Sequence, residues 1–227
     1  MAKLIKSIKN FKQKILFKIY YRNPSIYNHK PFNNKFKLRG NSLVCKSLLT
    51  KCTFDINGKN NKIIIEEGCN LNKCKFIVQG NSNTVYIKKN THARYAEFYI
   101  EDDNNSICVD EATYFAGKIH LACIEGCTIT IGKDCLFSSE IVIRTGDSHS
   151  ITDLSGNRIN QSKNVQIGDH VWVGHKVSIN KGVKIASNSV VGTGAIVTRE
   201  FNNGNVVIAG NPAKTVKENI NWDSKRI

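Results

Sequence analysis

The chain of 227 residues lacks several features that would assign it to common protein classes. No apolar run approaches the roughly 18 residues that a membrane-spanning helix needs, so we expect a soluble or peripheral protein. No apolar signal sequence is present, which favours a reducing compartment, the bacterial cytoplasm, for the eight cysteines. No Cys or Cys/His cluster has the spacing of a zinc site, so we expect no metal.

Acidic residues are missing from the first quarter of the chain. Before Asp55 there are 13 Lys and Arg and no Asp or Glu, whereas the 173 residues from Asp55 onward hold 20 basic and 18 acidic side chains. The formal charge of +15 therefore belongs to a terminal arm and not to one face of a domain. This distribution argues against nucleic acid as a partner.

The basic arm, residues 1–40, is predicted to be an amphipathic helix followed by a linker. Apolar side chains stand at helical spacing over residues 3–20, with lysines mostly between them: Leu4, Ile8, Phe11, Ile15 and Ile19. Such a helix either docks on the main domain or lies on an anionic membrane surface. The second alternative would make the protein peripheral at the inner face of the membrane.

Polar corners rich in Asn and Gly recur about every 22 residues after residue 41, and each precedes a short β-branched run. Residues 58–61 precede Ile63–Ile65, for example, and residues 80–83 precede Val85–Ile87. Each period also holds a second short strand. Short strands at a constant period predict a parallel β-solenoid. A β-sandwich would need hairpin turns and a regular polar/apolar alternation instead.

The carboxyl-terminal half has a shorter repeat, in which an aliphatic residue returns at every sixth position: Ile167, Val173, Ile179, Ile185, Val191 and Val197. A hexapeptide repeat predicts one face of a triangular coil per repeat and about 18 residues per coil. The aliphatic side chain is expected to point to the axis, and small residues are expected at the corners.

This repeat resembles that of the hexapeptide-repeat acyltransferase family, most clearly from about Ser138 to Lys217. The resemblance implies an all-β fold, a left-handed parallel β-helix over residues 41–210, in exception to the usual right-handed crossover. It also implies a tail, residues 211–227, that contacts the cofactor. Family members typically form homotrimers whose active sites lie between neighbouring solenoids, and we expect the same here.

The six-residue rhythm fails between Arg144 and Gln166, which predicts a loop extruded from a corner over residues 144–166. Loops held by a rigid scaffold often carry binding and catalytic residues. His149 lies in this loop, and Trp172 follows about one coil later. The pairing resembles that of sugar and polysaccharide O-acetyltransferases, including the sialate and polysialate enzymes. It implies that His149 is a catalytic base and that Trp172 forms an active-site wall that stacks on substrate or cofactor.

The expected chemistry suits these residue types. Acetyl transfer from a thioester to a hydroxyl needs a base that works near neutral pH, and imidazole meets that requirement. Direct attack requires no covalent enzyme intermediate, and a backbone amide is expected to stabilise the oxyanion. Asp147 or another carboxylate is a candidate to orient the imidazole. We expect Arg144, Asp147 and Lys163 to contact the acceptor.

The expected acyl donor is acetyl-CoA, because the last coils resemble the coenzyme A end of galactoside and maltose O-acetyltransferases. Carried over position by position, its contacts are Trp172, His175, Thr193, Thr198, Lys214 and Lys217. The two lysines would meet phosphates as cations. The family often has Ser where His175 stands and Arg where these lysines stand.

The expected reaction is acetylation of a sugar or polysaccharide hydroxyl, in a capsule, a lipopolysaccharide or a glycan that contains sialic acid. Two alternatives stay open. An N-acetyltransferase of an amino-sugar nucleotide or antibiotic shares the fold and the cofactor, but its product is a stable amide and not an alkali-labile ester. A non-catalytic solenoid that binds a polymer would transfer no acetyl group.

Overall fold

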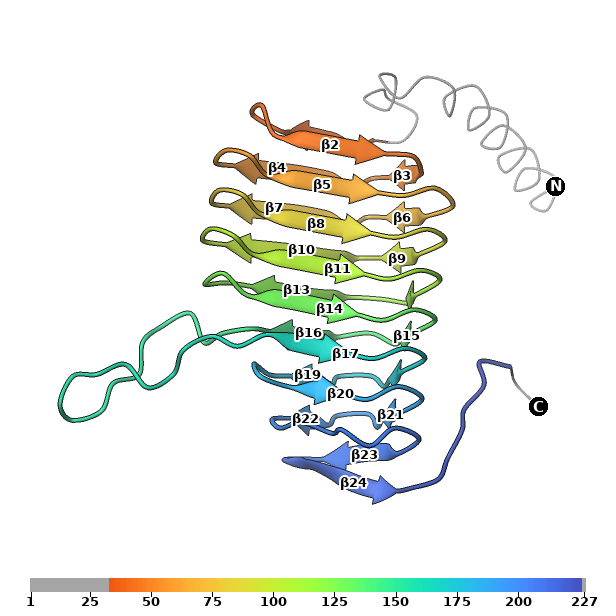
Figure 1. Ribbon diagram of the computed structural model, residues 1–227. Coiled ribbons are helices and arrows are strands. Elements are labelled where there is room, and N and C mark those ends of the chain that lie inside the picture. Colours follow the sequence, from red (N-terminus) through yellow and green to blue (C-terminus); the bar gives the residue numbers. More distant parts are fainter. Residues whose placement is uncertain (1–32, 226–227) are drawn as a thin grey trace.

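The computed structural model describes residues 33–225, which form three long sheets of short strands and contain no helix (Figure 1). The chain visits the three sheets in turn and then repeats the circuit. All pairings are parallel except the last, between β23 and β24. The prediction of a parallel β-solenoid is therefore confirmed.

The first sheet contains β1 (Lys35–Lys37), β4 (Thr53–Asn57), β7 (Lys75–Gln79), β10 (Ala96–Glu101), β13 (Ile119–Cys123), β16 (Ile141–Arg144), β19 (Ser178–Ile179) and β22 (Ile196–Val197). The second contains β2 (Ser42–Cys45), β5 (Lys62–Ile65), β8 (Thr84–Ile87), β11 (Ser106–Val109), β14 (Thr128–Ile131), β17 (Val165–Ile167) and β20 (Lys184–Ile185). The third contains β3 (Leu48–Thr50), β6 (Asn70–Asn72), β9 (His92–Arg94), β12 (Tyr114–Phe115), β15 (Leu136–Phe137), β18 (Trp172–Val173), β21 (Val190–Val191), β23 (Val207–Gly210) and β24 (Ala213–Lys217).

The coils change length along the solenoid. In the amino-terminal coils equivalent positions are 22 residues apart, as for Asn61 and Asn83. In the carboxyl-terminal coils they are 18 residues apart, as for Asp169 and Ser187. Both predicted periods are therefore present. One step between them takes 36 residues, from Ser139 to His175, because a long loop is inserted in that coil.

The core is a continuous column of inward-facing apolar side chains. All six aliphatic positions of the hexapeptide repeat have exposed fractions of 1% or less, which confirms their predicted direction. In the amino-terminal half aromatic rings fill the axis. Phe54, Phe76 and Phe98 stack with centroid separations of 4.4 and 4.7 Å. Equal coil length places each ring on the one below.

A buried asparagine ladder closes the corner between the first and second sheets. The backbone N–H of Asn83 donates to Asn61 Oδ1 at 2.9 Å, and that of Asn105 donates to Asn83 Oδ1 at 2.8 Å. The ladder ends on Cys127, whose N–H donates to Asn105 Oδ1 at 2.9 Å. The Asn-rich corners therefore satisfy backbone donors that would otherwise be buried without partners.

The predicted basic helix at residues 3–20 lies outside the described residues. Within residues 33–225 no helix is long and apolar enough to cross a membrane. The β-helix was predicted to span residues 41–210. The strand β1 lies before the first of these bounds, and β24 lies after the second.

Candidate functional site

The loop lies between β16 and β17, at the corner between the first and second sheets, and extends far from the solenoid (Figure 1). It leaves just after Thr145, whose hydroxyl accepts the Ile124 N–H at 2.9 Å. It begins with a very close approach at Gly146. A Cβ at that position would lie 2.2 Å from Ser162 Oγ and 2.6 Å from Ile124 Cδ1. Any larger residue at this position would have to displace the Ser162 and Ile124 side chains, so glycine favours the close approach of the two ends of the loop.

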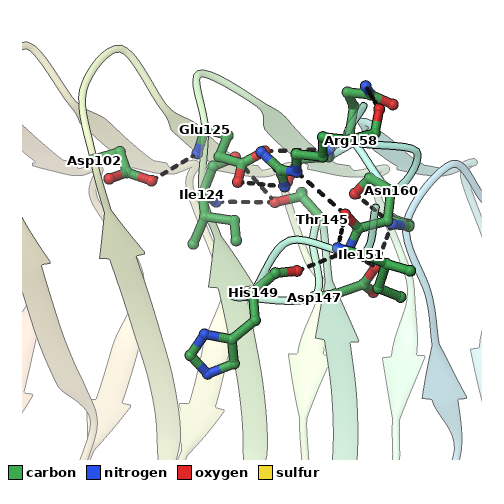
Figure 2. A network of polar contacts seen from close by, with 12 residues as sticks. Asp102, Ile124, Glu125, Thr145, Asp147, His149, Ile151, Arg158 and Asn160 are labelled. Atoms are coloured by element: carbon green, nitrogen blue, oxygen red, sulfur yellow. Dashed lines mark hydrogen bonds and ion pairs between the residues drawn. The ribbon is translucent and has the colours of Figure 1, made fainter. Parts of the chain in front are cut away.

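Asn160 holds the base of the loop together (Figure 2). Its side chain is 7% exposed, and its Nδ2 donates to the His149 carbonyl at 2.8 Å and to Asp147 Oδ2 at 2.9 Å. Its Oδ1 accepts the N–H of Ile151 at 2.7 Å and Arg158 Nε at 3.2 Å. The buried Asn160 amide therefore connects the outgoing segment of the loop, which contains His149, to the returning segment.

Two ion pairs anchor this arrangement to neighbouring coils. Arg158 Nη2 contacts Glu125 Oε1 at 2.7 Å and Oε2 at 3.0 Å, one coil toward the amino terminus. Lys181, one coil toward the carboxyl terminus, pairs with Asp147 and donates to the Asn160 carbonyl at 2.8 Å. The Arg158 contact holds the pKa of Glu125 below its usual value, and Lys181 and Asn160 hold that of Asp147 below its own. Both carboxyls therefore remain charged at neutral pH.

The His149 imidazole is exposed and points away from this network (Figure 2). Only its backbone carbonyl has a hydrogen-bond partner among the described residues, so its backbone is held while both ring nitrogens stay accessible. Asp147, a candidate to orient the ring, is instead engaged with Lys181 and Asn160. Its role toward an acceptor, like the role of His149 as a base, stays a prediction.

A cavity of about 260 Å³ lies beside the loop on the outer face of the first sheet. Its lining includes Tyr99, Glu101, His120, Arg144, Gly146 and Ser148. Burial, and then the charge of Arg144, lower the pKa of His120, whose Nδ1 lies 3.1 Å from Glu97 Oε1. Of the residues predicted to contact the acceptor, Arg144 lines this cavity, together with Ser148, the chain neighbour of His149. Lys163 is exposed at the other end of the loop.

The residues predicted to contact the cofactor lie elsewhere on the same chain. Trp172 is 41% exposed on β18 in the third sheet. His175 and Thr193 follow β18 and β21 at the corner between the third and first sheets, where the Gly194 N–H donates to the His175 carbonyl at 2.8 Å. One chain therefore does not bring His149 and Trp172 together, because the loop of His149 leaves the corner between the first and second sheets, whereas Trp172 lies on the third sheet opposite that corner.

The remaining predicted cofactor residues lie on the last coils. His175 is held by Ser139, whose Oγ and carbonyl oxygen both lie 2.9 Å from its Nδ1. Lys214 and Lys217 are exposed on β24, and Thr198 is exposed just after β22. His175, Thr193 and Lys214 therefore lie near the corner between the third and first sheets, whereas Thr198 lies at the corner between the first and second sheets, from which the loop leaves two coils higher. Their cofactor roles stay predictions.

The cysteines are all unpaired, and six of the eight are buried. Burial raises the pKa of Cys123 and of Cys135 to about 12, so both remain thiols at neutral pH. Within residues 33–225 no group of three or more His, Cys, Asp and Glu side chains is placed to hold a metal ion.

Sequence reasoning missed the positioning residues Asn160, Arg158, Lys181 and Glu125. Asn160 and Arg158 are polar residues in a polar loop, and nothing in their spacing distinguishes them. Their partners on other coils lie 21 and 33 residues away. The one available signal was the inserted length itself, because a long loop that must leave from a tight corner needs buried polar contacts at its base.

If His149 serves as the predicted base, replacing Asn160 with alanine should lower kcat by up to about 10²-fold with little change in melting temperature, because misplacing a catalytic group by about 1 Å can cost that much. Asn160→Asp should have a similar effect, since it puts an oxygen where Nδ2 now faces the Asp147 carboxylate. Ser150→Ala is the matched control, because Ser150 is exposed beside His149. Equal kcat for Asn160→Ala and Ser150→Ala would contradict the assigned role.

Comparison with known proteins agrees with this architecture. Residues 164–199 match the family model of the bacterial transferase hexapeptide (six repeats). The chain is 40% identical over 97 residues to the polysialic acid O-acetyltransferase of Escherichia coli O1:K1, covering 42% of this chain and 31% of that protein. It is 35% identical over 104 residues to the galactoside O-acetyltransferase of Escherichia coli K12, covering 46% of this chain and 51% of that protein.

Two solved structures extend the likeness over most of the solenoid. The polysialic-acid-specific acetyltransferase NeuO is 30% identical with a TM-score of 0.63, covering 77% of this chain and 89% of that one. The polysialic acid O-acetyltransferase OatWY is 33% identical with a TM-score of 0.64, covering 86% and 88%. The chain belongs to the hexapeptide-repeat transferase family. It spans about a third to a half of the curated relatives named above.

Proposed function

We propose that this protein is an acetyl-CoA-dependent O-acetyltransferase that acts on a sugar or polysaccharide hydroxyl, with His149 as its base. The observation that carries the proposal is the exposed His149 imidazole, held through its own backbone carbonyl by the buried Asn160. The relatives and solved structures named above are O-acetyltransferases of polysialic acid or galactosides. A base with free ring nitrogens suits attack by a hydroxyl.

In the proposed reaction His149 accepts the hydroxyl proton as the acceptor oxygen attacks the thioester carbonyl. The C–S bond of the tetrahedral intermediate then breaks, and the imidazolium returns a proton to the thiolate. The products are an O-acetyl ester and free coenzyme A. No enzyme nucleophile takes part, which agrees with the raised pKa values of the buried thiols Cys123 and Cys135. A backbone amide would stabilise the oxyanion.

We infer that the site is completed between subunits of a trimer of left-handed coils. The separation of His149 from Trp172, His175 and Thr193 within one chain supports this inference, because one molecule alone cannot offer both sets to one substrate. A neighbouring solenoid would present its third sheet and adjoining corner to the loop. Trp172, His175, Thr193, Lys214 and Lys217 of that neighbour, together with Thr198 at the corner between the first and second sheets, would then hold acetyl-CoA.

The acceptor is proposed to be anionic, such as a sialic-acid glycan, a capsule or a lipopolysaccharide. Arg144 in the cavity beside the loop, with Lys163 at the loop's other end, supports this preference. The basic arm would add charge in the same sense and could bring the protein to the cytoplasmic face of a bacterial membrane. A preference for neutral over sialylated glycans in kinetic assays would remove the anionic acceptor.

The proposal is tested by incubating the full chain with acetyl-CoA and a panel of bacterial glycans, and by measuring thiol release and product mass. An increase of one acetyl group that alkali removes is the expected result. An alkali-stable amide would favour the N-acetyltransferase, and no thiol release with any glycan would favour a non-catalytic solenoid.

A further inference from the structure

The end of the described chain turns back along the solenoid and docks at the corner between the second and third sheets (Figure 1). The Ile220 N–H donates to the Asn205 carbonyl at 2.9 Å, and Asn205 Nδ2 donates to the Ile220 carbonyl at 3.0 Å. Beyond this point the chain continues to Trp222, which contacts His170 just before β18. In the third sheet β18 lies two strands above β23. The tail therefore has defined contacts with the solenoid at two levels, that of Asn205 and that of His170.

Trp222 and His170 contact one another in three ways. Their rings stack with centroids 4.1 Å apart and planes 10° from parallel. Trp222 Nε1 donates to the His170 carbonyl at 2.9 Å, and His170 Nε2 lies 3.1 Å from the Trp222 carbonyl. The other ring nitrogen of His170 lies 2.9 Å from Asp134 Oδ2, one coil above. The imidazole is therefore fixed on both sides and offers a rigid platform to the indole.

The docked indole lies next to Trp172. The two ring centroids are 6.0 Å apart with planes 43° from parallel, a separation within the range of interacting aromatic pairs. Trp172 is nevertheless 41% exposed, so Trp222 supports one edge of this ring and leaves the rest open. An exposed indole on a flat sheet has several rotamers available, and a fixed neighbour removes those that it would overlap.

We propose that Trp222 is a positioning residue: docked on His170, it holds Trp172 in the orientation in which Trp172 serves as a wall of the active site. The tail would then act on the site through Trp172. This inference rests on the proposed function, because it takes Trp172 as a wall that contacts substrate or acetyl-CoA. The contact itself can be tested without any enzymatic activity.

The kinetic test compares Trp222→Ala, Trp222→Phe and Trp172→Ala in the full chain. Trp222→Ala should raise the KM of the same substrate whose KM rises in Trp172→Ala, by roughly two- to tenfold as expected for an aromatic pair. Its kcat should stay near that of the wild type. Trp222→Phe keeps a ring on His170 and should largely restore KM. Asn221→Ala, an exposed neighbour, is the matched control.

A double variant distinguishes positioning from an independent contribution. If Trp222 acts through Trp172, the Trp172→Ala/Trp222→Ala double variant should be no worse than Trp172→Ala alone. Full additivity of the two effects, or an unchanged KM for both substrates in Trp222→Ala, would overturn the proposal.

Fluorescence separates this proposal from the proposed function, because the chain has only two tryptophans. Trp172 is the sole indole in both Trp222→Ala and Trp222→Phe, so its emission reports its surroundings directly. We expect red-shifted emission and stronger acrylamide quenching in Trp222→Ala than in Trp222→Phe. Identical emission would overturn the positioning role. A clear difference in a protein that transfers no acetyl group would support the contact and count against the proposed function alone.

Discussion

Replacing His149 with alanine should lower kcat for acetyl transfer by about 10²- to 10⁴-fold, the usual contribution of a general base. The melting temperature should stay near that of the wild type. The imidazole makes no hydrogen bond among the described residues, and Asn160 binds the backbone carbonyl, which alanine keeps. Steady-state kinetics with acetyl-CoA and an accepted glycan, together with thermal melting, measure both effects.

The matched control for this substitution is His92→Ala. His92 is also an exposed histidine, but it lies on β9 in the third sheet, three coils before β18, and it lines neither the cavity nor the loop. Its removal should leave kcat unchanged. If His149→Ala retained wild-type kcat on a glycan that the enzyme acetylates, the assignment of His149 as the base would be wrong.

Phe76→Ala should lower the free energy of unfolding by about 3–5 kcal/mol, the usual cost of deleting a buried phenyl ring. The ring is fully buried between Phe54 and Phe98, at centroid separations of 4.4 and 4.7 Å. Its neighbours stack on both faces and are themselves held by strand pairing, so they cannot collapse into the space. Urea unfolding, followed by circular dichroism, is the measurement.

Tyr114→Ala provides the comparison, because Tyr114 is an aromatic residue on β12 that is 41% exposed. Its substitution should change the free energy of unfolding by no more than about 0.5 kcal/mol, as is usual for surface positions. Equal losses for Phe76→Ala and Tyr114→Ala would contradict a continuous aromatic axis. In a solenoid, each coil contacts only its neighbours, so the loss should appear first in the amino-terminal coils.

The repeat was readable because it is a local property of the chain. An aliphatic side chain must point inward once per face, so spacing alone predicts that Ile167, Val173 and Ile179 are buried. The amino-terminal coils were readable for the same reason, through their Asn and Gly corners. Phe54, Phe76 and Phe98 also recur at equal spacing in the sequence, but spacing alone does not indicate that their rings stack on one another.

The break in the hexapeptide repeat predicts the loop, but it does not predict the contacts that hold the loop. Asn160 contacts the His149 carbonyl 11 residues away, and Arg158 reaches Glu125 33 residues away. Such contacts depend on which corners lie above one another and on the direction of each side chain. The position of Trp222 beside Trp172 has the same origin, since the tail crosses two coils before it docks.

The sequence by itself determined the solenoid, its two coil lengths, the direction of the aliphatic side chains and the place where a loop leaves it. These follow from periodicity, because each coil must bury the same positions as the one below. Only the tertiary structure decided that Asn160 holds the loop, that His149 and Trp172 lie on opposite sides of one chain, and that Trp222 docks beside Trp172. Those relations join residues from different coils, and no local pattern encodes which polar side chains will meet across them.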